Sequence, residues 1–152
     1  MPAFHVTKVV WEHGEKYGHV FMPQDMQGLK EKIEQFHNEG LNKNYPFQVE
    51  ISFDDPQFYV SFTVGHEYSC MMFAYAIDNN TVEGPFYVVN PAGREEEIIP
   101  IYLFASYTEP DTRTMLPYTK VREAVFHFAE TYLFPLSIRF DDDIVNGRFI
   151  QS

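Results

Sequence analysis

The sequence predicts an α+β fold, in which a mostly antiparallel β-sheet has two main helices packed on one face. Short segments with apolar residues at every second position recur through the first two thirds of the chain, separated by turns of Gly, Asp, Asn and Pro. Two longer segments repeat apolar residues every three or four positions, which is typical of amphipathic helices. The 152 residues contain no internal repeat and no change of composition, so we expect one domain over residues 1–152.

The amino-terminal part predicts a β-hairpin and then a helix. Two short strands, over about residues 4–11 and 17–21, are joined around Gly14. The apolar residues that follow recur at helical spacing: Met26, Leu29, Ile33 and Phe36. The residues between them are mostly charged or polar, and Gly40 is suited to the carboxyl end of the helix. We therefore expect this helix to pack one face on the sheet.

The middle of the chain predicts most of the sheet. Strands are expected over residues 47–53, 58–64, 68–77, 84–90 and 98–105. The first two alternate regularly between apolar and polar residues, with Asp54, Asp55 and Pro56 as the turn between them. The third, YSCMMFAYAI, is apolar on both sides and is therefore predicted to lie in the centre of the sheet. A polar loop is expected after the last of these strands.

A second helix and a last strand are predicted near the carboxyl end. The helix starts at Pro117 with Thr119 as its N-cap, and Pro135 ends it because proline has no amide hydrogen to donate. Its buried stripe is expected to be Val121, Ala124, Val125, Phe128 and Tyr132. Residues 136–140 then alternate as a strand, which stops at a run of three aspartates.

The charge of the chain narrows the class of partner. It has 22 Asp and Glu against 11 Lys and Arg, a formal net charge of −11. Such a field repels nucleic acid phosphates and anionic lipids, and it accelerates encounter with a basic protein. No apolar run reaches the roughly 18 residues of a membrane span, and the amino-terminal residues lack a signal-peptide core. We therefore expect a cytoplasmic protein with no direct nucleic acid partner and no membrane partner.

No catalytic or metal-binding motif is present in the sequence. The six histidines include no H-E-x-x-H pair, and G-x-S-x-G, glycine-rich phosphate loops and Cys–His nucleophile signatures are absent. Cys70 is the single cysteine, so it forms no internal disulfide and matches no zinc spacing. The aspartates at 141–143 lack the alternating ligands of a calcium loop. The sequence therefore predicts no enzyme, no metal and no cofactor; an enzyme with an unrecognised site is the third hypothesis for the function.

The segment LPYTKVREAVFHFAETYLFPLSIRFDDD, residues 116–143, is the most specific part of the sequence. It combines a proline at the start of a helix, an R-x-A-x-x-x-F run within it, a proline after it and a short strand. The residues concerned are Pro117, Arg122, Ala124, Phe128 and Pro135, with the strand at 136–140. In these features the segment resembles immunity protein family 1 of bacterial polymorphic toxin systems. That family commonly has a glycine at the helix C-cap and a tryptophan near the end of the last strand; here Tyr132 or Leu133 and Phe140 stand there.

The resemblance implies a small cytoplasmic protein that binds and neutralises a cognate toxin domain in interbacterial competition. Toxins paired with this family are often nucleases or nucleic acid deaminases. Enzymes that act on nucleic acid usually have a basic groove, which an acidic inhibitor can occlude. We expect one-to-one binding, by a monomer or by a weak homodimer that forms through an exposed edge strand.

The candidate toxin-binding residues are acid clusters and exposed aromatics near them. They are Asp54, Asp55, Tyr59, Glu95, Glu96, Glu97, Tyr107, Asp141, Asp142 and Asp143. For each acid cluster, turn formation or simple solvation is the alternative explanation. A different function is also open, because 15 Phe and 10 Tyr could line an internal pocket. The second hypothesis is therefore a non-catalytic domain that binds a small apolar ligand in an aromatic-lined pocket.

Overall fold

A computed structural model describes residues 3–11, 19–103 and 106–151, and it confirms the α+β class. The strands are β1 (Val6–Trp11), β2 (His19–Phe21), β3 (Phe47–Phe53), β4 (Phe58–Val64), β5 (Tyr68–Ala76), β6 (Val82–Tyr87), β7 (Ile101–Leu103), β8 (Ser106–Thr108) and β9 (Met115–Pro117). The helices are α1 (Met26–Lys43), α2 (Tyr118–Thr131) and α3 (Asp143–Phe149), with a 3₁₀ turn η1 at Thr112–Thr114. The expected hairpin turn around Gly14 lies outside the described residues.

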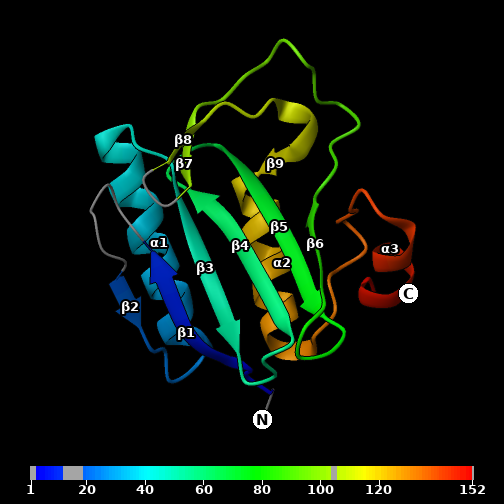
Figure 1. Ribbon diagram of the computed structural model, residues 1–152. Coiled ribbons are helices and arrows are strands. Elements are labelled where there is room, and N and C mark those ends of the chain that lie inside the picture. Colours follow the sequence, from blue (N-terminus) through cyan, green and yellow to red (C-terminus); the bar gives the residue numbers. More distant parts are fainter. Residues whose placement is uncertain (1–2, 12–18, 104–105, 152) are drawn as a thin grey trace.

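The main sheet has the strand order β2-β1-β3-β4-β5-β6, and every neighbouring pair on this path is antiparallel. Strands β3 to β6 follow one another as a meander, so the β3–β4 and β5–β6 turns are at the same end of the sheet. Short β7 pairs parallel with β3 at Phe47 and Tyr102, and β8 pairs with β7. Helices α1 and α2 lie behind the sheet in Figure 1, while α3 lies beside β6.

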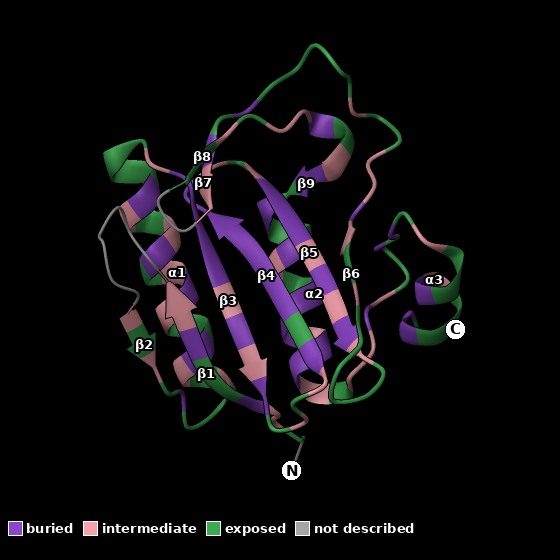
Figure 2. Ribbon diagram, viewed as in Figure 1, coloured by how far each residue is buried: buried purple, intermediate pink, exposed green. Residues whose placement is uncertain are grey.

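The core lies between the sheet and this helical layer, as the buried segments of Figure 2 show. Each strand contributes alternate residues, because successive side chains point to opposite faces. The largest fully buried side chains include Leu29, Ile33 and Phe36 of α1, Phe128 of α2, and Phe47, Phe62 and Phe73 of the sheet. Aromatic rings meet here at close range: Phe128 and Phe134 stack with ring centroids 4.4 Å apart. The many phenylalanines of the sequence thus pack against one another in the core.

The opposite face of the sheet is covered only in part. Cys70 points to this face and forms a second buried cluster with Ile99, Ile101 and Met115, which come from the segment after β6. Farther along the strands none of the described helices covers this face (Figure 1), and Tyr59 of β4 is 54% exposed. We call this uncovered part the open sheet face.

The predicted strand at 136–140 is wrong. Only single bridges form, from Phe134 to Ile150 and from Phe140 to Val88, and the Ile138 amide donates to the Pro135 carbonyl in a turn. The apolar alternation reflects burial of Ile138 and Phe140 rather than a continuous strand pairing. The chain then forms α3, a helix that was not predicted from the sequence.

The helix ends differ from the prediction in three places. Helix α1 continues to Lys43, and Asn44, with φ 50°, ends it. Gly40 is instead needed for packing, because a Cβ there would lie 2.6 Å from the Cα of Gly65. Helix α2 begins before the predicted cap Thr119, with Pro117 at its N-cap. Helix α2 ends at Thr131, before Pro135, because Tyr132 adopts a left-handed conformation.

One predicted strand is much shorter than expected, and the loop after it contains a strand that was not predicted. Residues 98–105 form a strand only at Ile101–Leu103, while residues 104 and 105 lie outside the described part of the chain. The loop expected after them contains β8 at Ser106–Thr108. Here β7 and β8 pair as a short antiparallel unit at the margin of the sheet, which the local sequence pattern does not indicate.

Candidate functional site

The β3–β4 turn is held by the residue that ends α2. Tyr132 has φ 59°, a left-handed conformation for which glycine is the usual residue. Its hydroxyl donates to Asp54 Oδ1 and accepts a 3.1 Å hydrogen bond from the Asp55 amide. His5 stacks on the Tyr132 ring at 4.2 Å, with its Nδ1 3.2 Å from Asp54 Oδ2. The side chain of Tyr132 therefore ties three segments together.

These contacts keep Asp54 ionised. The hydrogen bond from Tyr132 is the main cause that lowers the pKa of Asp54 below its usual value, with a further contribution from His5. Burial and the same hydrogen bond raise the pKa of Tyr132 to about 12, so the phenol keeps its proton. The Asp55 carboxylate accepts from the backbone amide and side-chain amide of Gln57, at 3.2 and 2.7 Å. Both aspartates are fixed in place, as the turn interpretation expects.

The β5–β6 turn lies beside this one. The Ala76 amide donates a 2.8 Å hydrogen bond to the Gln57 carbonyl, which links the two turns at the lower end of the sheet in Figure 1. Asp78 accepts from the Asn80 amide at 2.8 Å, and this bond is the main cause that lowers its pKa. A surface depression of about 400 Å³ separates the turns; it is lined by Asp55, Pro56, Gln57, Ala76, Ile77, Asp78, Asn79 and Val82.

Two aliphatic side chains of this depression are largely accessible: Ile77 is 60% exposed and Val82 is 65% exposed. We call Asp54, Asp55, Pro56, Ile77, Asp78 and Val82 the turn patch. Within the described residues, no lysine or arginine forms an ion pair with its three aspartates. The patch therefore combines an apolar centre with an acidic rim, an arrangement suited to a basic protein surface.

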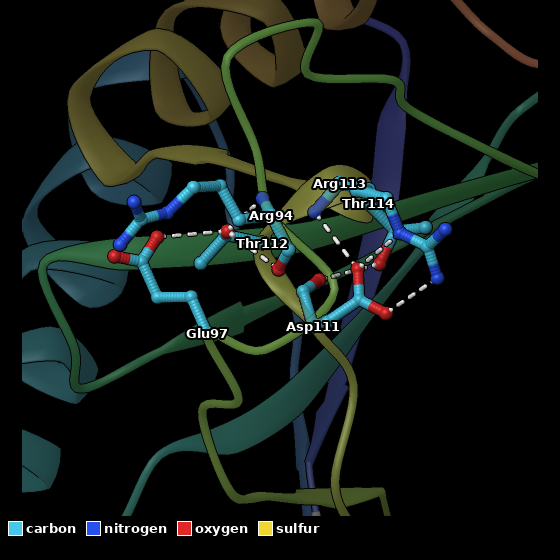
Figure 3. Close-up of polar contacts among 6 residues, drawn as sticks. All are labelled: Arg94, Glu97, Asp111, Thr112, Arg113 and Thr114. Atoms are coloured by element: carbon cyan, nitrogen blue, oxygen red, sulfur yellow. Dashed lines mark hydrogen bonds and ion pairs between the residues drawn. The ribbon is translucent and has the colours of Figure 1, made fainter.

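The Glu95–Glu97 run lies at the other end of the sheet and has a different role. Thr112, which is 1% exposed, donates from its hydroxyl to Glu97 Oε1 at 2.8 Å and from its amide to the Glu97 carbonyl at 3.0 Å (Figure 3). Arg94 pairs with Glu96 at 3.4 Å, and Asp111 holds Arg113 through both carboxylate oxygens. Arginines thus compensate much of the local charge, while Glu95 is exposed.

The three aspartates after residue 140 mostly hold the backbone. Asp141 Oδ1 accepts from the Tyr87 amide at 3.1 Å, and the Asp141 amide donates to the Tyr87 carbonyl. Asp142 is the N-cap of α3 and accepts from the Val145 amide at 3.0 Å. Asp143 is exposed in the first helical turn. The structure places this cluster beside β6, apart from both other acid clusters (Figure 1).

The two predicted aromatics are both exposed, but they lie in different places. Tyr59 is on the open sheet face, where the nearby charge of Glu50 is the main cause that raises its pKa. Tyr107 is on β8 beside a cleft at the opposite end from the turn patch, and it is 55% exposed. The ten predicted contacts therefore do not form one surface. Asp54 and Asp55 belong to the turn patch, whose exposed apolar centre, Ile77 and Val82, was not predicted from the sequence.

Ile77, Asp78 and Val82 were absent from the predicted site. The signal that could have found them is the meander itself, since consecutive hairpins bring alternate turns to one end of a sheet.

The residues of the R-x-A-x-x-x-F run are structural. Ala124 and Phe128 are fully buried, and Arg122 Nη1 donates to Glu34 Oε1 of α1 at 2.7 Å.

A polar cluster surrounds that ion pair. The Tyr118 hydroxyl donates to Glu34 at 3.0 Å, and the His37 ring stacks on Tyr118 at 3.6 Å. His37 Nδ1 accepts from the Gly65 amide at 2.9 Å. Burial lowers the pKa of His37. The pKa of Glu34 is also lowered: burial acts to raise it, but the hydrogen bonds from Arg122 and Tyr118 outweigh that effect. The cluster joins α1, α2 and the β4–β5 turn.

Other kinds of site find little support in the described part of the chain. No group of three or more His, Cys, Asp or Glu side chains there is arranged to hold a metal ion. Burial raises the pKa of Cys70 to about 12, so its thiol is protonated and unreactive at neutral pH. None of the helices in the described ranges is long and apolar enough to cross a membrane.

Comparison of the chain with protein-family models, curated proteins and solved structures finds no match.

Proposed function

We propose that this protein binds and neutralises a cognate bacterial toxin domain by covering a basic substrate groove with the turn patch. The single observation that supports this site is the apolar pair Ile77 and Val82, exposed between ionised aspartates of two adjacent turns. The resemblance of residues 116–143 to an immunity protein family suggests the kind of partner. A nuclease or nucleic acid deaminase is the expected toxin.

The chemistry of the patch suits such a partner. Carboxylates can occupy the positions of substrate phosphates in a basic groove, and opposite charges raise association rates above about 10⁵–10⁶ M⁻¹s⁻¹. Binding energy at protein interfaces is concentrated in a few central, desolvated residues. Ile77 and Val82 supply that centre, and the aspartates around them supply orientation and steering.

The rigidity of the patch adds to its suitability. The Tyr132 hydroxyl fixes Asp54, Gln57 fixes Asp55, and the Asn80 amide fixes Asp78. Side chains that are already ordered lose less conformational entropy when a partner binds. A pre-organised patch of this kind favours slow dissociation as well as rapid association.

The proposal is tested with the toxin domain that we expect a gene beside the one for this protein to encode. Ile77→Arg places a positive charge at the centre of the patch, and we expect it to weaken binding by about 100-fold, the loss of one strong interface contact. Ile144→Arg is the matched control, because Ile144 is 69% exposed in α3, away from the patch. Affinity is measured by calorimetry, and protection is measured by co-expression with the toxin.

Charge reversal separates the acid clusters. Asp78→Lys is expected to weaken binding at least tenfold, whereas Asp143→Lys and Glu95→Lys are expected to change it less than threefold. Equal losses for all three would mean that net charge, not the patch, drives association. A toxin that binds with full affinity to both Ile77→Arg and Asp78→Lys would rule out the turn patch as the interface.

The alternative function, binding of a small apolar ligand, has one observation in its favour. A cleft of about 260 Å³ beside Tyr102 and Tyr107 is partly lined by aromatic rings. It is open to solvent and lies outside the core, in contrast to the internal pocket that the sequence composition suggested.

A further inference from the structure

The cleft beside β7 and β8 is a second surface of distinct chemistry, at the opposite end of the sheet from the turn patch (Figure 1). It is formed where the end of α1, the start of β3, the β4–β5 turn and the β7–β8 unit meet. We call it the tyrosine cleft; its lining residues are Asn44, Pro46, His66, Ile98, Ile99, Pro100, Tyr102 and Tyr107. Rings and prolines thus make up most of its walls.

The tyrosines are held in fixed positions. Tyr102 and Tyr107 are cross-strand partners, with ring centroids 5.6 Å apart at an angle of 69°. Tyr45 also stacks on Tyr102 at 4.2 Å, and the Tyr102 amide donates to the Pro46 carbonyl at 2.9 Å. Tyr107 nevertheless remains 55% exposed at the mouth of the cleft. An ordered ring with an exposed face is suited to packing against another ring.

Polar groups in the cleft include hydrogen-bond donors. His66 Nδ1 accepts from the Tyr68 amide at 2.9 Å, so the proton of the neutral imidazole is on Nε2. That nitrogen is a donor. Asn44, whose side-chain amide carries two donor hydrogens, lines the α1 side of the cleft. A polypeptide with unpaired carbonyl groups can accept hydrogen bonds from groups of this kind.

The rim of the cleft is acidic on the β8 side. The Tyr107 hydroxyl hydrogen-bonds to the Glu109 carboxylate, which raises the pKa of Tyr107 together with the larger effect of partial desolvation. Glu109 is exposed, and so is Glu67, which follows His66 in the β4–β5 turn. A cation that enters beside Tyr107 would be attracted to the Glu109 carboxylate.

We propose that the tyrosine cleft binds an extended, proline-rich segment of a partner protein that carries a lysine or arginine beside its prolines. Such segments adopt the polyproline II conformation, which has no internal hydrogen bonds and loses little entropy on binding. Proline rings pack on the exposed ring of Tyr107, and the free carbonyls accept from His66 and Asn44. The basic residue pairs with Glu109. This interaction is independent of the turn patch and of the toxin proposed to bind there.

The experiment is an NMR titration of the full chain, labelled with ¹⁵N, with a decapeptide of nine prolines ending in one arginine. We expect saturable shifts at the amides of His66, Tyr102 and Tyr107. Tyr107→Ala should weaken binding about tenfold, and Tyr59→Ala, which removes an equally exposed tyrosine from the open sheet face, should leave it unchanged. Glu109→Gln should weaken binding of the arginine peptide a few-fold but leave an all-proline peptide unaffected.

The absence of saturable shifts with the arginine peptide would overturn the proposal. Equal losses for Tyr107→Ala and Tyr59→Ala would do the same, as would equal binding of a glycine–serine peptide with the same terminal arginine. p-Cresol serves as a probe for a small aromatic ligand. If it shifts the cleft residues and the peptide does not, the occupant is a small molecule and the proposal is wrong.

Discussion

Helix α2 and the turn patch differ in what their side chains contact. In α2, the residues of the family resemblance face inward: Ala124 and Phe128 are fully buried and Arg122 is bound to Glu34. In the turn patch, Ile77 and Val82 are more than half exposed. The difference teaches that the residues of this run hold the helical layer on the sheet, whereas the turn residues are free to face another molecule.

The largest expected effect comes from the core side of this comparison. Phe128 contacts Phe53, Phe58, Phe73 and Phe134 within the core. Phe128→Ala is expected to lower the free energy of unfolding by about 3–5 kcal/mol, because it removes buried surface and leaves a cavity. Urea denaturation of the purified protein measures this change.

The turn patch provides the matched control. Val82→Ala, at a residue that is 65% exposed, should change the free energy of unfolding by less than about 0.5 kcal/mol. A similar destabilisation by both substitutions would show that the exposed side chains of the patch have a structural role, and the contrast with α2 would fail.

A smaller effect is expected at Tyr132, where the end of α2 contacts the turn patch. Tyr132→Phe removes the hydroxyl that bonds to Asp54 and to the Asp55 amide but keeps the ring that stacks on His5. We expect a loss of about 1–1.5 kcal/mol in the free energy of unfolding. The pKa of Asp54, followed by NMR, should rise toward its usual value, because the Tyr132 hydrogen bond is the main cause of its depression.

The sign of the accompanying pH effect follows from that depressed pKa. Above the usual pKa of 3.8, Asp54 is ionised in both states and its stabilising contribution is complete. The contribution is lost as the pH falls through the lower pKa of the folded state. If the pKa of Asp54 were unchanged in Tyr132→Phe, the Tyr132 hydroxyl at the end of α2 would have no effect on the electrostatics of the turn patch.

The smallest effect concerns the polar cluster between the helices. Burial lowers the pKa of His37 below 6.5, although Glu34 opposes this; Arg122 and His66 also face the ring and lower the pKa further. As the pH falls through 6.5, the unfolded chain takes up a proton at His37 before the folded chain does. Stability should therefore decrease on acidification until the pH is below the folded pKa.

His37→Gln removes this titration, while its side-chain oxygen remains able to accept from the Gly65 amide. Stability is compared between the two proteins by denaturation from pH 8 to pH 5. The variant is expected to lose less stability over this range. Parallel curves would show that His37 does not contribute to the pH dependence of the folded state.

Some elements could be predicted from local pattern and others could not. Strands β3 and β4 were placed at their observed bounds, because apolar alternation and the Asp54–Asp55 turn are local features. The supposed strand at 136–140 has the same alternation, but it runs where only isolated bridges form. A strand requires a partner along its length, and no pattern within one segment reports whether that partner is present.

The candidate site likewise has features that could be predicted from the sequence and features that could not. The acidic charge and the turn-forming character of Asp54 and Asp55 follow from composition and spacing, since both depend on residues close in the chain. Their association with Ile77, Asp78 and Val82 depends on strand order, which brings two turns together across more than twenty residues of sequence. Tertiary structure also decided that Asp141 accepts from the Tyr87 amide and that Glu97 binds Thr112. Acidic runs that look alike in the sequence therefore acquire different roles, because each role is set by the groups that folding places beside them.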